Sequence, residues 1–193
     1  MAMTRYTYPH SIENGGGERL VFLRRVPSPD GDVLEGENFV QPGAGPPMHV
    51  HKLQSESLTV VRGRIGYQRP GEPEQFGGPG ETVTFKPGEG HRFWNAGTEE
   101  LHCLGRIAPA DNAEYFLTQL FESTKRNGGT RPDPFDIAFL ISRYRSEFGV
   151  LEIPAAVQRI MFPVLLLIGR MRGKYRRYAD APEPVTAPAA RGS

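Results

Sequence analysis

Cysteine is nearly missing from this sequence, which has one cysteine among 193 residues. A single cysteine cannot form an intrachain disulfide, so the fold has to be held by a packed core. The hydrophobic content of 38% is enough for a sizeable one. The chain also has almost no excess of one charge, because its formal net charge is +1. It therefore has no overall electrostatic field that would attract nucleic acid. We therefore expect no nucleic-acid partner.

Long apolar segments are also scarce. The clearest apolar run, residues 160–168, is about half as long as the roughly 20 residues that a membrane-spanning helix needs. The N-terminal residues lack the apolar core of a signal peptide. We therefore predict a cytoplasmic protein without a transmembrane span. Peripheral membrane contact is the alternative, because a basic stretch, residues 170–177, follows the apolar run.

Glycine and proline, by contrast, are abundant, with 23 and 18 residues, as is typical of a β-barrel with many tight turns. The length fits one domain with appendages. From these patterns we expect a flexible N-terminal arm at residues 1–17 and a barrel at residues 18–110. A helical appendage at residues 111–178 and a disordered tail at residues 179–193 would follow.

Four residues with metal-binding side chains lie in the central part of the chain: His49, His51, Glu56 and His91. His49 and His51 are two positions apart, so a β-strand would direct both imidazoles to one face. Glu56 can return to the same point across a turn or bulge, and His91 opens a later strand. Three imidazoles and one carboxylate suit one divalent transition metal. We favour Fe²⁺, with Mn²⁺, Ni²⁺, Co²⁺, Cu²⁺ and Zn²⁺ as alternatives.

The spacing of these residues resembles the two motifs of the cupin superfamily. The first motif, with its His-x-His pair, fits residues 43–63 at every position, and the second fits residues 80–95 with one departure. Lys86 occupies the position of the motif's proline, and Pro87 follows it. The departure changes a turn and no ligand. The resemblance covers residues 18–109 and implies a mainly β fold, the double-stranded β-helix or jelly-roll barrel of a small bacterial-type cupin.

After residue 109 the pattern becomes helical, and we expect about three α-helices, over residues 113–126, 134–148 and 154–178. Asp111 or Asn112 can cap the first helix and Asp133 the second. Pro163 lies inside the third and should kink or break it. One hypothesis is that these helices form a lid that shields the pocket from water. Otherwise they cover the barrel or a dimer partner.

Several other side chains have both a functional and a structural interpretation: His10, Met48, Phe93, Trp94, His102 and Cys103. We expect His10 to be exposed on the N-terminal arm, Met48 to pack, and the inward member of the adjacent Phe93 and Trp94 to belong to the core. No base lies beside Cys103 in the sequence, so we interpret it as a small buried hydrophobe. For His102 we favour an outward position over a role as a base near the metal.

Three functions fit this pattern. The first is a metal-dependent oxygenase of dioxygenase type that acts on a small organic molecule, with Glu56 as a ligand and as a catalytic proton acceptor. The second is a non-redox isomerase, cyclase, decarboxylase or lyase whose metal acts as a Lewis acid. The third is a non-catalytic, metal-loaded module that binds a small molecule. The resemblance places the oxygenase slightly first and implies a homodimer paired through edge strands.

Overall fold

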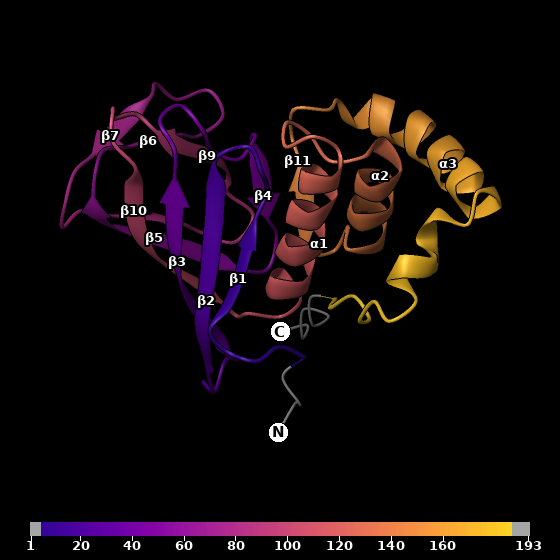
Figure 1. Ribbon diagram of the computed structural model, residues 1–193, viewed down its shortest axis with the longest axis horizontal. Helices are drawn as coiled ribbons and strands as arrows, with labels where there is room; N and C mark the ends of the chain where they lie inside the picture. The colour runs from indigo at the N-terminus through magenta and orange to yellow at the C-terminus, as the bar shows by residue number, and fades with distance from the viewer. Residues whose placement is uncertain (1–4, 187–193) are drawn as a thin grey trace, which may run out of the picture.

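The computed structural model describes residues 5–186, and these form two antiparallel β-sheets followed by helices (Figure 1). The larger sheet contains, in spatial order, β1 (His10–Glu13), β2 (Glu18–Val26), β3 (Val33–Val40), β10 (Leu101–Ala108), β5 (Ser55–Arg62) and β8 (Thr82–Phe85). The smaller sheet contains β11 (Phe148–Val150), β4 (His49–His51), β9 (Gly90–Asn95), β6 (Ile65–Gln68) and β7 (Gln75–Gly77). The predicted mainly β, jelly-roll type of fold is confirmed.

The main core of this sandwich lies between the sheets because the strands alternate apolar and polar residues. In β8, for example, Val83 and Phe85 are buried while Thr82 and Thr84 are exposed. Full burial of a large apolar side chain contributes about 1.5–3 kcal/mol relative to its exposure. The buried cluster consists of Val40, Leu58, Val60, Ile65, Val83, Phe85, Phe93, Leu101 and Cys103.

The N-terminal segment differs from the expected mobile arm. Residues 10–13 form β1, which pairs with β2, and Ile12 is buried in a second core against the helices. Nδ1 of His10 lies 3.1 Å from Oε1 of the buried Glu114, so His10 is not the exposed histidine that we expected. The arm prediction was wrong for these residues, because their partners come from distant segments. Residues 1–4 lie outside the described part of the chain.

Three α-helices and one 3-10 helix follow the sandwich within residues 5–186: α1 (Ala113–Arg126), α2 (Pro134–Arg143), α3 (Ala155–Met171) and η1 (Lys174–Tyr178). The carboxylate of Asp133 accepts a hydrogen bond from the backbone N–H of Phe135 and caps α2 as predicted. Asn112 does not cap α1 with its side chain. Instead, its amide donates to Glu147 Oε1 at 2.8 Å and to the backbone oxygen of Glu183.

The predicted end of the second helix was wrong, since α2 ends at Arg143 and not at residue 148. The chain turns there and forms β11, which pairs with β4 in the register Phe148 to His51 and Val150 to His49. This pairing supplies the backbone hydrogen bonds at the edge of β4. The apolar pattern of residues 134–148, from which we predicted a helix, does not reveal such a pairing. The appendage is therefore not purely helical: it completes the sheet that carries two of the candidate ligands.

The last segments also depart from expectation. The helix α3 continues through Pro163, which therefore does not break it. Residues 179–186, expected to be disordered, lie against the helices. The guanidinium of Arg143 donates to the backbone oxygen of Pro182, and the backbone N–H of Val185 donates to Glu147. These tail contacts use backbone groups, which explains why composition alone did not predict them. Residues 187–193 lie outside the described part of the chain.

Candidate metal centre

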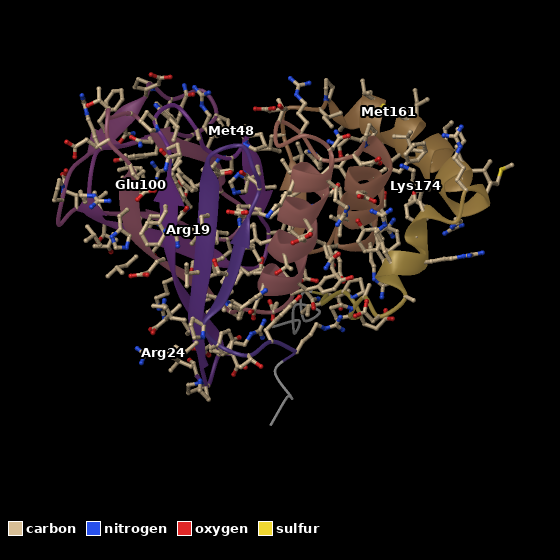
Figure 2. The ribbon with its side chains drawn as sticks, viewed as in Figure 1. Arg19, Arg24, Met48, Glu100, Met161 and Lys174 are labelled. Atoms are coloured by element: carbon tan, nitrogen blue, oxygen red, sulfur yellow. The ribbon has the colours of Figure 1, made fainter. Side chains whose placement is uncertain are left out.

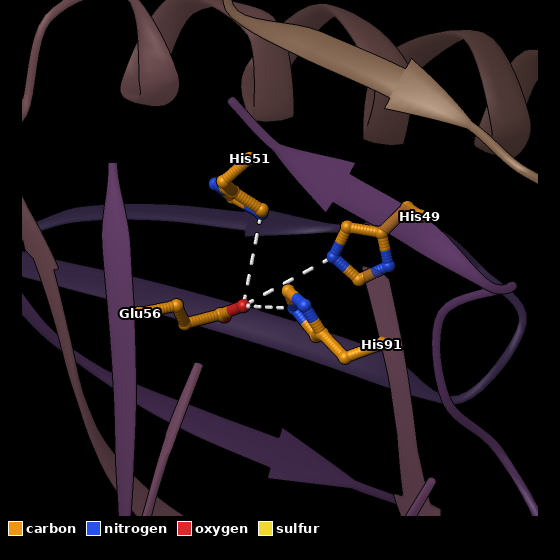
Figure 3. Close-up of side chains that lie close together, drawn as sticks. All are labelled: His49, His51, Glu56 and His91. Atoms are coloured by element: carbon orange, nitrogen blue, oxygen red, sulfur yellow. Dashed lines mark hydrogen bonds and ion pairs between the residues drawn. The ribbon is translucent and has the colours of Figure 1, made fainter. Parts of the chain in front are cut away.

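The structure brings the four candidate ligands together between the two sheets (Figure 3). His49 and His51 project from one face of β4, and His91 lies directly opposite His49 on the neighbouring strand β9. Glu56 comes from β5 in the larger sheet and faces the three imidazoles. One ligand atom from each residue lies within 4.8 Å of the others. The arrangement can therefore hold one metal ion.

The imidazole nitrogens converge on one carboxylate oxygen. The Nε2 atoms of His91, His51 and His49 lie 2.9, 3.7 and 4.0 Å from Oε2 of Glu56. Nδ1 of His49 donates to the backbone oxygen of Pro47 at 2.8 Å, and Nδ1 of His91 donates to that of Glu89 at 2.9 Å. These backbone bonds fix the tautomer of a neutral ring, so that its Nε2 lone pair faces the centre.

The donor set fits a cation by its own chemistry. His91 has a hydrogen-bond acceptor beside each ring nitrogen, the Glu89 carbonyl and the Glu56 carboxylate. A neutral imidazole has only one N–H and cannot satisfy both. A divalent cation held by Nε2 and by Oε2 removes this conflict. Three imidazoles with one carboxylate suit first-row transition metals, and the predicted ligand set fits the structure in this respect.

The protonation states of the site favour metal binding. Burial, together with the neighbouring His51 and His91, lowers the pKa of His49 to about 3. Burial also lowers the pKa of His51. For Glu56, burial raises the pKa, but hydrogen bonding with His91 and electrostatic interaction with the three imidazoles, which would stabilise the carboxylate wherever a ring is protonated, outweigh it and lower the pKa to about 2. At neutral pH, His49 and His51 are therefore neutral and Glu56 is ionised, as metal ligands must be.

Three of the ligands, His49, His51 and Glu56, line a cavity that encloses about 640 Å³ including its open mouth. The enclosed space that water-sized groups can occupy is much smaller, about 80 Å³. Gly36 of β3 and Gly105 of β10 pair in register in its floor. A Cβ atom would have room at Gly105, whereas at Gly36 it would lie 2.7 Å from the backbone oxygen of Val21. Most of the remaining lining is apolar: Leu20, Phe22, Leu34, Leu58, Phe93, Ile107, Leu117 and Phe121. The last two come from α1, so the C-terminal segment forms part of the pocket wall.

Four further polar residues line the cavity and were not identified from the sequence: Glu18, Glu37, Asn38 and Arg106. Burial raises the pKa of Glu18 to about 7, against the opposing hydrogen bond from Asn14 and with a smaller contribution from the charge of Glu56. Asn38 is 5% exposed, and its Oδ1 has no hydrogen-bond partner among the described residues. The alternation of β2 and β3 could have indicated which residues face inward. Glu18, for example, precedes the inward-facing Leu20 by two residues and therefore lies on the same face of β2.

The other candidates lie away from the ligands or in the core. Phe93 is buried and lines the cavity, whereas Trp94 is partly exposed and packs edge-on against Phe76. Met48 is partly buried and does not line the cavity. His102 faces away from the pocket and stacks on Phe39, as we favoured. Phe93, the inward-facing member of the aromatic pair, therefore belongs both to the core and to the wall of the pocket.

Cys103 is buried, and burial raises the pKa of its thiol to about 12. A thiol in this state is a poor nucleophile. We expect that iodoacetamide at about pH 8 leaves the native protein unmodified and alkylates one cysteine after unfolding in guanidinium, as intact mass shows. Rapid alkylation of the native protein would contradict the structural interpretation of Cys103.

Comparisons with known proteins agree with the motifs. Residues 39–105 match the family model of the cupin domain, and this part of the chain is therefore a cupin domain. A Klebsiella pneumoniae protein with a double-stranded β-helix domain is 21% identical, with a TM-score of 0.40, over 55% of this chain and 78% of that one. KdgF from Halomonas sp. is 16% identical, with a TM-score of 0.47, over 54% and 92%.

A third solved structure belongs to the polyketide cyclase RemF from Streptomyces resistomycificus. It is 22% identical, with a TM-score of 0.44, over 55% of this chain and 78% of that chain. None of the curated proteins matches the sequence. The assignment to the cupin family therefore rests on the segment that carries both motifs and on the observed fold.

Proposed function

We propose that this protein is a metal-dependent cupin enzyme that acts on a small, largely apolar organic molecule, and that its reaction is an oxygenation of dioxygenase type. The observation that carries the proposal is the position of the ligand cluster in the wall of an apolar cavity. A purely structural metal site is closed on all sides, whereas a catalytic one is open to a substrate. Here three of the four ligands face the space where a substrate can bind.

The roles of the residues follow from their chemistry. His49, His51, Glu56 and His91 would hold the ion, and Fe²⁺ held there would supply redox chemistry with dioxygen. The apolar lining excludes water and positions the carbon skeleton of the substrate. The carboxylate of Glu56 is ionised at neutral pH and faces the cavity, so we assign it a second role as the acceptor of a substrate proton.

A non-redox isomerase, cyclase or lyase is the second candidate, and Glu18 favours it. With a pKa of about 7, the carboxyl group of Glu18 can take up and return a proton near neutral pH. It lines the same cavity as the ligands. In such an enzyme the metal would polarise a carbonyl group, and no oxygen would be consumed. Oxygen consumption therefore distinguishes the two candidates.

The test begins with elemental analysis of the protein purified without added metal. Oxygen uptake is then measured with a panel of catechols, flavonols and thiols. We expect near-stoichiometric iron, or another redox-active metal, together with substrate-dependent uptake. Zinc, or metal without uptake, would favour the non-redox enzyme. A protein that stays metal-free even after metal is added would contradict both enzyme proposals.

A matched pair of variants tests whether the cavity is the substrate site. A Cβ atom at Gly105 would find no heavy atom nearer than 3.8 Å, so Gly105→Ala should fit and serve as the control. Gly105→Leu fills the floor of the cavity. We expect it to keep its metal and to lower kcat/KM about 10–100-fold, since pocket contacts of a few carbon atoms have effects of this size. Unchanged kcat/KM in Gly105→Leu would place the substrate elsewhere.

A further inference from the structure

The outer side of α3 is an exposed apolar surface, formed by Val157, Ile160, Met161, Val164, Leu167 and Met171 and called here the α3 face. Their spacing of three and four residues places them on one side of the helix. Met171, Ile160 and Leu167 are 80%, 74% and 61% exposed. Soluble proteins rarely expose a continuous apolar patch of this kind without an interaction partner.

The α3 face is not the result of loose packing, because the opposite side of the helix is docked. Phe162 and Gly169 on that side are buried, and the phenol of Tyr175 donates to the backbone oxygen of Leu165 at 3.2 Å. Lys174 Nζ, in η1 just after α3, lies 2.8 Å from Oδ2 of Asp133, the residue that caps α2. Figure 1 shows α3 as the outermost helix, on the far side of α2 from the sandwich.

The surroundings of this face are basic. Residues 155–178 contain six lysine and arginine residues and neither aspartate nor glutamate. Lys174 and Arg177 form salt bridges to Asp133 and Asp136. The other four are exposed and form no salt bridge within residues 5–186: Arg159, Arg170, Arg172 and Arg176. Figure 2 labels Met161 and Lys174 at this end of the molecule, away from Arg19 and Glu100 on the sandwich.

The charge pattern argues against a second copy of the chain as the occupant. If two α3 faces met antiparallel around Val164, Arg159 of one copy would lie beside Arg170 of the other, since the two residues are nearly equidistant from Val164. No acidic residue of α3 is available to offset this repulsion. An anionic lipid surface satisfies both features, because it accepts apolar side chains and attracts the basic ones.

We propose that α3 lies in the interface of an anionic phospholipid membrane, with the α3 face inserted between the lipids and Arg159, Arg170, Arg172 and Arg176 against their headgroups. The helix lies on such a surface and does not cross it: no helix within residues 5–186 is long and apolar enough to span a bilayer. The inference is independent of the metal centre, because no residue of α3 lines the cupin cavity.

The test is flotation of the full-length protein with vesicles of phosphatidylcholine alone, or of phosphatidylcholine with an equal amount of phosphatidylserine. We expect binding to the mixed vesicles only, and weaker binding at high salt. The double variant Ile160→Asp, Leu167→Asp should lower the partition coefficient at least about 100-fold. The double variant Arg159→Gln, Arg170→Gln should lower it about 30-fold.

Folding and dimerisation are controlled in the same experiment. Val61→Asp changes an exposed apolar residue on β5, far from α3, and should bind vesicles like the unchanged protein. Metal content and light scattering are measured for every variant. Absence of flotation, or equal flotation of the aspartate double variant, would overturn the proposal. A dimer that dissociates in that variant, without any vesicle binding, would instead assign the α3 face to a second copy.

Discussion

Replacing both His49 and His91 with alanine is expected to reduce the metal content from near one ion per chain to background. The two residues face each other on β4 and β9, with ring centroids 4.4 Å apart, and their loss leaves only His51 and Glu56. Two donors cannot compete with water for a divalent transition metal in the way that four can. The measurement is elemental analysis after dialysis against a metal-containing buffer and removal of free ions.

The control for this variant is His102→Ala. His102 stacks on Phe39 outside the pocket, so its removal should leave the metal content unchanged. Circular dichroism must show that the double variant is folded, since His91 also stacks on the core residue Phe85 with a centroid distance of 3.9 Å. If a folded double variant keeps stoichiometric metal, the assignment of the metal centre is wrong.

The ligand cluster could be predicted because each step followed from a local rule. The two-residue period of a strand put His49 and His51 on one face, and β4 bears this out. The spacing of the two cupin motifs placed Glu56 and His91 near that face, although they come from different strands. Local periodicity combined with family spacing was therefore sufficient to predict that these four side chains lie together.

The contributions of distant segments could not be predicted in this way. The strand β11 has three residues, and only its pairing with β4 makes it a strand. Likewise, β1 is polar by composition and is held by β2 and by the buried Glu114 of α1. For the apolar run at residues 160–168, the sequence left open whether it covers the barrel, a dimer partner or a membrane. The structure shows that one side of α3 is docked and the other is exposed. In each case tertiary contacts decide what local preference leaves open.

The identity of the metal, the substrate, the homodimer and the cytoplasmic location stay predictions. The α3 inference bears on the last of these, because the cytoplasmic leaflet is the anionic one in many membranes. A cupin held at that surface would meet apolar molecules where they are concentrated, which agrees with the apolar lining of its cavity. Vesicle binding tests whether the protein lies at a membrane, and substrate chemistry tests whether its cavity takes an apolar molecule. The two experiments are separate.

Replacing Phe148 with alanine is expected to destabilise the protein by about 3–5 kcal/mol, as is typical of a buried phenylalanine. Phe148 stacks on Phe116 of α1, with a centroid distance of 4.3 Å, and meets the ring of His51 edge-on at 5.4 Å. The variant therefore removes the contact through which the C-terminal segment holds one candidate ligand. The measurements are urea unfolding of the metal-free protein and metal affinity by competition with a chelating dye.

The conservative variant Phe148→Leu separates the two effects of this change. Leucine keeps most of the buried volume and should cost less than about 1.5 kcal/mol. If metal affinity falls in Phe148→Ala but not in Phe148→Leu, the C-terminal segment positions His51 by filling the space beside its ring. If stability falls in Phe148→Ala while metal affinity is unchanged, the positioning role is contradicted. The segment then supports the sandwich, and β4 alone orients its two histidines.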